Sequence, residues 1–177
     1  MKSRNRTTSR RDIERFLRVD HDGERAAQQI YKGQLAVLAN LEMVDEIHHM
    51  MDQEVEHLET FDSLLNERKM RPSLVDPSWR LAVFTFGLVT AAIGPKAAMA
   101  CTIAVEEATG KNYQKQADIL GEDELDLHAI NERFHDEELK HRDIVVDHDG
   151  REAQNYELLR SVIQRDCRTA IKIAEKI

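Results

Sequence analysis

The 177-residue sequence has few of the residues that interrupt helices or mark a sheet protein. It contains only seven glycines and three prolines, and aromatic residues make up 5% of the chain. A protein built from many short strands needs more turn residues than this, so the scarcity argues against an all-β fold. Strong helix formers, namely Ala, Leu, Glu, Gln, Lys, Arg and Met, are plentiful instead. The composition therefore predicts an all-α protein.

Cysteine and excess positive charge are also scarce. The two cysteines, Cys101 and Cys167, lie far apart and neither belongs to a Cys-x-x-Cys motif, which fits a reducing compartment. The net charge of −8 is unfavourable for binding a nucleic-acid backbone. The N-terminus lacks the apolar stretch of a secretory signal. We expect a protein of the cytosol or the mitochondrial matrix that binds no nucleic acid.

A chain of this length forms one ordinary domain with a substantial core. Its clustered basic residues lie at the start, between Lys2 and Arg18. We expect residues 1–12 to be a flexible basic N-terminus and residues 13–177 to form a single domain. A contact with anionic lipid and a remnant of a transit sequence are the alternative explanations for the basic terminus.

Hydrophobic residues recur at helical spacing along most of the chain. The pattern predicts helices at about 10–40, 43–69, 81–93, 95–120, 122–148 and 151–176. Pro95 suits the first turn of the fourth helix, while Gly121 and Gly150 separate the later helices. The expected architecture is a bundle of long helices.

The stretch from Leu81 to Ile93 is uncharged on every face but is only 13 residues long, whereas a membrane-spanning helix needs about 20. It is either a core helix or a helix that lies in a membrane interface or against a greasy substrate. In the second case, Trp79 and Arg80 would lie at the level of the lipid headgroups. The candidate membrane or substrate-tail contacts are Trp79, Leu81, Phe84, Phe86 and Leu88.

Four Glu-x-x-His pairs are the most informative motifs, because residues three apart share one helix face and can reach one metal ion. They are Glu46/His49, Glu54/His57, Glu132/His135 and Glu138/His141. The second and fourth pairs continue apolar stripes, so we expect them to point inward. The other two share their faces with polar residues and should meet solvent. The choice between the last two pairs is the less clear one.

An internal repeat extends this pattern. Glu24 precedes Glu54 by 30 residues and Glu106 precedes Glu138 by 32, and each leading Glu is followed seven residues later by a tyrosine. The chain thus contains two helix pairs, each with one Glu on its first helix and Glu-x-x-His on its second. Four Glu and two His are the ligand set of ferritin-like di-iron and di-manganese bundles. The predicted ligands are Glu24, Glu54, His57, Glu106, Glu138 and His141.

Other residues are candidates for supporting roles. Tyr31 and Tyr113 lie two turns from the leading acids and could position a substrate or pass protons or electrons, or simply pack in the core. A ligating histidine usually donates its second N–H to a carboxylate, and the candidate acceptors are Asp20, Asp143 and Asp147. His148 lies two turns after His141 and could line the same channel. Periodicity barely separates Glu106 from its neighbour Glu107, although the spacing to Tyr113 favours Glu106.

Five segments resemble the demethoxyubiquinone hydroxylase family of ubiquinone biosynthesis. They are RVDHDGE (18–24), IYKGQLAVL (30–38), DQEVEHL (52–58), AMACTIAVEE (98–107) and DEELKHRD (136–143), and the similarity extends from about Ile13 to the C-terminus. The resemblance implies a ferritin-like four-helix bundle with additional helices and a di-iron site in its core. Carried over by position, it implies the same six ligands and favours Glu106 over Glu107 and Glu138 over Glu132.

The resemblance also implies an activity. Family members are peripheral membrane monooxygenases that use two Fe²⁺ ions and O₂ to hydroxylate the ring of an isoprenoid quinone, with NADH or the quinol as electron source. It further implies the cytoplasmic face of a bacterial inner membrane or the matrix side of the mitochondrial inner membrane. A lipid-binding accessory protein of the same pathway and a homo-oligomer are the other expected partners. Some residues depart from the family pattern, although none is a ligand: Asp22, Arg25, Asn112 and Arg142.

Three rival functions would use the same features differently. A ferritin-like iron-binding or storage protein would share the ligands and form a shell. A di-iron hydroxylase acting on tRNA would share the chemistry, but the acidic composition opposes it. A helical membrane-association module would leave the acids solvated and bind no metal.

Overall fold

The computed structural model describes residues 7–38, 43–73 and 77–176. Within these ranges the chain is all-helical and contains no strand. The helices are α1 (Arg10–Leu38), α2 (Val44–Glu67), α3 (Pro77–Ile93), α4 (Pro95–Ala117), α5 (Leu125–Asp147) and α6 (Tyr156–Ala174), with single 3-10 turns η1 (Glu122–Glu124) and η2 (Gly150–Glu152). The predicted fold class and all six predicted helices are confirmed.

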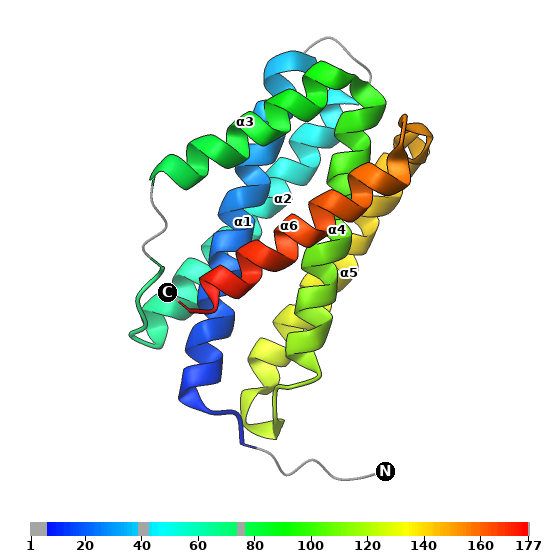
Figure 1. Cartoon of the computed structure of the whole chain (residues 1–177). Helices are drawn as coiled ribbons and strands as arrows, with labels where there is room; N and C mark the ends of the chain where they lie inside the picture. The colour runs from blue at the N-terminus through cyan, green and yellow to red at the C-terminus, as the bar shows by residue number, and fades with distance from the viewer. Residues whose placement is uncertain (1–6, 39–42, 74–76, 177) are drawn as a thin grey trace.

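Four long helices, α1, α2, α4 and α5, form a ferritin-like bundle (Figure 1). Within it, α1 packs along α2 and α4 packs along α5, which are the two helix pairs that the repeat predicts. Helix α3 lies across α1, and α6 lies across α4, so the two additional helices cover one side of the bundle.

The ends of the helices differ little from the predicted ones. Helix α1 begins at Arg10, and the backbone N–H of Thr8 donates to Asp123 over 3.2 Å, so the described part of the fold starts before Ile13. Residues 1–6 of the predicted flexible terminus lie outside the described residues. Helix α3 begins at Pro77 rather than Leu81, since proline suits a first helical turn. Gly94, at φ 150°, separates α3 from Pro95 in a conformation that other residues avoid.

Two hydrophobic clusters fill the bundle. The first contains Phe61, Tyr113 and Phe134, and the second contains Tyr31, Met50 and Met99 among others. Along each bundle helix, residues of one cluster precede the predicted acidic ligand in the sequence and residues of the other cluster follow it. The fold therefore places the acids midway along the bundle, between two apolar layers that separate them from bulk water.

The composition of α3 left open whether it is a core helix or a surface helix. In the structure, one face of α3 is buried and the other is exposed. Val83, Thr90 and Ala91 are buried, whereas Leu81 and Ile93 are 66% and 70% exposed. Of the other predicted contacts, Trp79 is exposed, and Phe84, Phe86 and Leu88 are half-buried. No helix in the described part of the chain is both long and apolar enough to cross a membrane.

Candidate metal centre

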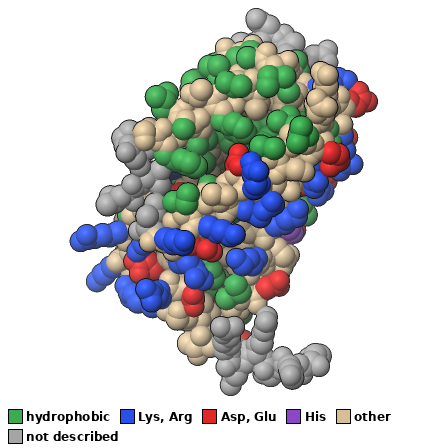
Figure 2. Space-filling view, viewed as in Figure 1, with side chains coloured by type: hydrophobic (Ala, Val, Ile, Leu, Met, Phe, Trp, Pro, Cys, Tyr) green, Lys and Arg blue, Asp and Glu red, His purple; other side chains and the backbone are tan. Residues whose placement is uncertain are grey.

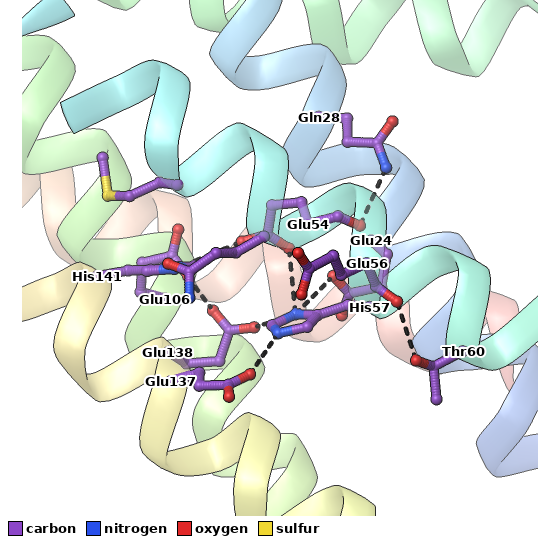
Figure 3. A network of polar contacts seen from close by, with 12 residues as sticks. Glu24, Gln28, Glu54, Glu56, His57, Thr60, Glu106, Glu137, Glu138 and His141 are labelled. Carbon is purple, nitrogen blue, oxygen red and sulfur yellow. Dashed lines mark hydrogen bonds and ion pairs between the residues drawn. The ribbon is translucent and has the colours of Figure 1, made fainter. Parts of the chain in front are cut away.

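The six predicted ligands lie together in the middle of the bundle (Figure 3). Helices α1 and α4 each supply one Glu, and α2 and α5 each supply a Glu-x-x-His pair. All six side chains are almost fully buried, with at most 2% exposed. In the other two pairs, His49 and Glu132 are exposed as predicted, whereas Glu46 and His135 are half-buried, and His135 Nδ1 lies 2.8 Å from the carbonyl oxygen of Gly110.

The ligand atoms form two groups that share two residues. Glu24, Glu54, His57 and Glu138 offer one set of atoms within 4.8 Å of one another, and Glu54, Glu106, Glu138 and His141 offer another. Glu54 and Glu138 belong to both sets. A carboxylate has two oxygens and can bind two metal ions at once, so this arrangement is suited to a pair of cations that lie side by side.

Both histidines present the same ring nitrogen to the acids. His57 Nδ1 lies 3.4 Å from Glu24 Oε2, and His141 Nδ1 lies 3.2 Å from Glu54 Oε1. The two rings are nearly parallel, with centroids 6.4 Å apart. The Nδ1 atoms therefore face the cluster, and the Nε2 atoms are available for other partners.

Glu137 and Gln53 hold those outer nitrogens. His57 Nε2 lies 2.7 Å from Glu137 Oε2, and His141 Nε2 lies 2.9 Å from Gln53 Oε1. The pattern is reciprocal. Gln53 directly precedes Glu54 on α2 and hydrogen-bonds to the histidine of α5. Glu137 directly precedes Glu138 on α5 and hydrogen-bonds to the histidine of α2. These hydrogen bonds fix the orientation of each ring.

The acceptors predicted from the sequence are therefore replaced by these two. Asp143 lies two residues beyond His141, on another side of the helix, and pairs with Arg142 at the surface. Asp147 is exposed. Asp20 is buried, but its Oδ1 accepts hydrogen bonds from Asn112 and Gln116, at 3.0 and 2.7 Å, rather than from a ligand histidine. His148 is partly exposed and lies 3.6 Å from Glu46, away from the cluster.

The two buried tyrosines form hydrogen bonds between the two helix pairs of the bundle. The Tyr31 hydroxyl of α1 donates to Glu106 Oε1 of α4, and the Tyr113 hydroxyl of α4 donates to Glu24 Oε1 of α1. Each tyrosine therefore supports the leading acid of the other helix pair and not the acid seven residues before it. Both side chains contact ligands directly, in addition to packing in the core.

Comparison with known proteins agrees with this geometry. Residues 11–174 match the family described as Ubiquinone biosynthesis protein COQ7. The chain belongs to this family. It is 46% identical over 166 residues to a Rhodospirillum rubrum protein named 3-demethoxyubiquinol 3-hydroxylase, covering 93% of this chain and 78% of the relative. A human relative, NADPH-dependent 3-demethoxyubiquinone 3-hydroxylase, mitochondrial, is 41% identical over 173 residues, 96% of this chain and 80% of its own.

A yeast relative is less similar in sequence. The Saccharomyces cerevisiae protein named 5-demethoxyubiquinone hydroxylase, mitochondrial, is 37% identical over 182 residues, covering 93% of this chain and 78% of the relative. The alignments thus include nearly the whole of this chain, and with it all four helices that carry the cluster.

Without a bound cation, the buried carboxylates of the cluster repel one another. Burial, together with the charge of Glu54, raises the pKa of Glu24 and of Glu138 well above the usual range. For Glu54, hydrogen bonds from Glu24, His141 and His57 outweigh burial and lower the pKa. Hydrogen bonds with acids likewise outweigh burial for the histidines, raising the pKa of His57 to about 11 and that of His141 to about 10.

The poorly bonded atoms show what would relieve this repulsion. Several buried atoms of the cluster make no well-aligned hydrogen bond, although oppositely charged groups lie within 4 Å of them: Glu24 Oε2, Glu54 Oε1, both oxygens of Glu138, and Nδ1 of His57 and His141. An unsatisfied buried acceptor is costly, and two divalent cations would satisfy these atoms and neutralise four carboxylates. Mixed carboxylate and imidazole donors suit iron or manganese. In this COQ7-family chain the donor set therefore fits a two-metal site.

Sequence reasoning missed Gln53 and Glu137, although a signal for them exists. Each occupies the position directly before the Glu of an inward-pointing Glu-x-x-His pair. Such a residue projects from the side of its helix and can reach only a neighbouring helix. Recognising it as a partner of the opposite histidine requires knowing that α2 and α5 face each other across the cluster.

Proposed function

We propose that this protein is a di-iron monooxygenase that uses O₂ to hydroxylate the ring of demethoxyubiquinone, or of its quinol, in ubiquinone biosynthesis. The observation that carries the proposal is the pair of buried ligand groups sharing Glu54 and Glu138. The names of the bacterial, human and yeast relatives, all hydroxylases of demethoxyubiquinone or its quinol, support the substrate and the reaction.

Two iron ions are the proposed metals, and the six clustered side chains are their proposed ligands. Glu24 and His57 would serve one ion and Glu106 and His141 the other, with the two shared acids between them. When bound, iron supplies the activation of O₂ and the oxygen-atom transfer that amino-acid side chains cannot perform. The residues that hold it are Glu24, Glu54, His57, Glu106, Glu138 and His141.

The protein's own residues would orient these ligands and control protons. Glu137 and Gln53 fix the ring planes, so that Nδ1 of each histidine stays directed at the cluster. The hydroxyls of Tyr113 and Tyr31 direct their protons at Glu24 Oε1 and Glu106 Oε1, which accept the hydrogen bonds. We propose these tyrosines as catalytic residues that position the quinone ring or move that proton. The apolar layers on both sides would exclude water from the reacting groups.

The isoprenoid tail needs an apolar path out of the bundle, and α3 is the proposed one. Exposed Trp79 and Leu81 and half-buried Phe84, Phe86 and Leu88 line this helix and its start. Figure 2 shows hydrophobic side chains gathered over α3 on one face of the molecule. We propose that this face contacts the membrane that dissolves the substrate, which makes the protein peripheral rather than membrane-spanning.

The remaining partners are proposed from the family. Reducing equivalents would come from NADH or from the quinol itself, and the name of the human relative specifies NADPH. The location would be the cytoplasmic face of a bacterial inner membrane or the matrix side of the mitochondrial inner membrane. A lipid-binding accessory protein and a second copy of this chain are the proposed macromolecular partners.

The test is ring hydroxylation by iron-loaded protein. Protein loaded anaerobically with Fe²⁺ is given a short-tail demethoxyquinone, NADH and ¹⁸O₂, and mass spectrometry follows the ring. We expect a gain of one ¹⁸O atom with the wild type and with the surface variant Glu132→Ala, and none with Glu138→Ala, which lies two turns away on the same helix. Full turnover by Glu138→Ala would refute the site. Two bound irons without product would refute the substrate and favour iron storage.

A further inference from the structure

A basic groove crosses the same side of the molecule as the apolar face of α3. It consists of two adjoining hollows, one of about 250 Å³ between α4 and α6 and one of about 540 Å³ between the first turns of α1 and the end of α6. Glu175 lines both hollows and joins them. The cations that line them are Arg11, Arg15, Arg18, Lys111, Lys115, Arg168, Lys172 and Lys176.

This concentration of positive charge contrasts with the chain's net charge of −8. The only acids lining the two hollows are Glu14 and Glu175. Four of the eight cations form ion pairs: Arg15 with Asp12, Arg18 with Glu14, Lys111 with Glu107 at 3.9 Å and Lys115 with Glu175 at 4.0 Å. Within the described part of the chain, no ion pair with a carboxylate engages Arg11, Arg168, Lys172 or Lys176. The positive charges in the groove thus outnumber the carboxylates that pair with them, and the groove attracts anions.

Apolar side chains lie beside the groove rather than on the opposite side of the molecule. On α6 itself, Leu158 and Val162 are 66% and 37% exposed and precede the groove residue Arg168 by a few turns. Figure 2 shows the green hydrophobic surface in the upper part of this face and the blue Lys and Arg side chains below it. Trp79 and Arg80, both exposed, stand at the start of α3.

We propose that the basic groove binds the phosphate groups of anionic phospholipids and thereby orients the protein on the bilayer. A free phosphate compound would use the cations but not the adjoining apolar surface. A bilayer offers both, with acyl chains for the exposed residues of α3 and α6 and phosphates for the groove. The proposal rests on the membrane association proposed above and adds to it a selectivity for negatively charged lipid and a defined orientation.

Vesicle flotation tests the groove separately from the apolar face. The full chain is mixed with neutral phosphatidylcholine vesicles and with vesicles containing about one third phosphatidylglycerol. A basic residue near an anionic surface contributes about 1 kcal/mol, which is about fivefold in partitioning. We expect Lys172→Glu to weaken binding to the anionic vesicles at least fivefold. Lys140→Glu, an equal change of charge at an exposed site on α5, should leave binding unchanged.

The outcomes separate the inference from the proposed membrane association. Equal wild-type binding to neutral and anionic vesicles would overturn the groove's role while keeping membrane association. No binding to either would overturn both. Unchanged vesicle binding by Lys172→Glu would overturn the inference and would favour an acidic protein as the ligand of the groove. Hydroxylation of a soluble short-tail quinone should be the same for Lys172→Glu as for the wild type, since the groove lies outside the ligand cluster.

Discussion

The residues around the cluster support one another across the bundle rather than along a helix. Tyr31 and Tyr113 bond to acids of the opposite helix pair, and Gln53 and Glu137 bond to histidines of the opposite helix. Both histidines and both leading acids, Glu24 and Glu106, are therefore positioned by a residue of the other half. Loss of one such residue should alter metal binding without removing a ligand.

Glu137 is the clearest case for a test at this scale. Replacing it with Ala leaves His57 Nε2 without its partner, and loss of such an outer hydrogen bond typically weakens metal binding about 10–100-fold. We expect Glu137→Ala to lower iron affinity by that factor, measured by competition with a chelator. Glu132→Ala, an exposed acid on the same helix, should behave as the wild type. Equal affinity of the two variants would show that His57 does not depend on Glu137.

The sequence predicts the six clustered side chains but not their supporting contacts. Spacing along one helix defines a face, and the apolar stripe selects Glu54 clearly, whereas the choice of Glu138 over Glu132 and of Glu106 over Glu107 depends on the family resemblance as well. The hydrogen bonds of Gln53 and Glu137 depend on how two helices face each other. A pattern within one helix carries no information about that arrangement.

At the scale of elements, the close contact between α1 and α3 sets the position of the apolar helix. A Cβ atom on Gly87 would lie 2.2 Å from the carbonyl oxygen of Ile30, and one on Gly33 would lie 2.2 Å from that of Phe84. The two backbones thus touch, and α3 rests directly on the helix that carries Glu24. The sequence could not decide between a core and a surface helix, because the Leu81–Ile93 part of α3 is uncharged on both its buried and its exposed faces.

This contact predicts opposite effects of the same substitution at two glycines. Gly87→Ala must force α3 away from backbone atoms, and overpacking of this kind costs about 1–3 kcal/mol of unfolding free energy. Gly23→Ala, in the interior of α1 with no atom within 4 Å of the added Cβ, should stabilise by up to about 1 kcal/mol. Denaturant unfolding measures both. A Gly87→Ala protein as stable as the wild type would contradict the close packing.

For the whole molecule, the metal-free cluster makes stability dependent on pH. His57 and His141 have folded pKa values of about 11 and about 10, against 6.5 when unfolded, so their contribution is complete below pH 6.5 and is lost as pH rises towards 10–11. The raised pKa values of Glu24 and Glu138 act in the same direction above the unfolded value of 4.5. The favourable contribution of Glu54 changes only at acidic pH and is constant in this window.

We therefore expect the Tm of the metal-free protein to fall between about pH 6 and about pH 8.5. Iron competes with protons for the same atoms, so the stabilisation that it provides should grow over the same range. Calorimetry of metal-free and anaerobically iron-loaded protein at both pH values measures the two trends. A metal-free Tm that rises with pH would contradict the buried, proton-sharing cluster.

Iron stoichiometry tests the central claim, a two-metal centre on six residues, most directly. Anaerobic loading with Fe²⁺, removal of loosely held metal and elemental analysis should give two irons per chain for the wild type. Glu46→Ala, from the outward pair on α2, should also bind two, whereas Glu54→Ala removes the acid common to both ligand groups and should retain fewer than one while staying helical. Two irons in folded Glu54→Ala, or none in the folded wild type, would contradict the account.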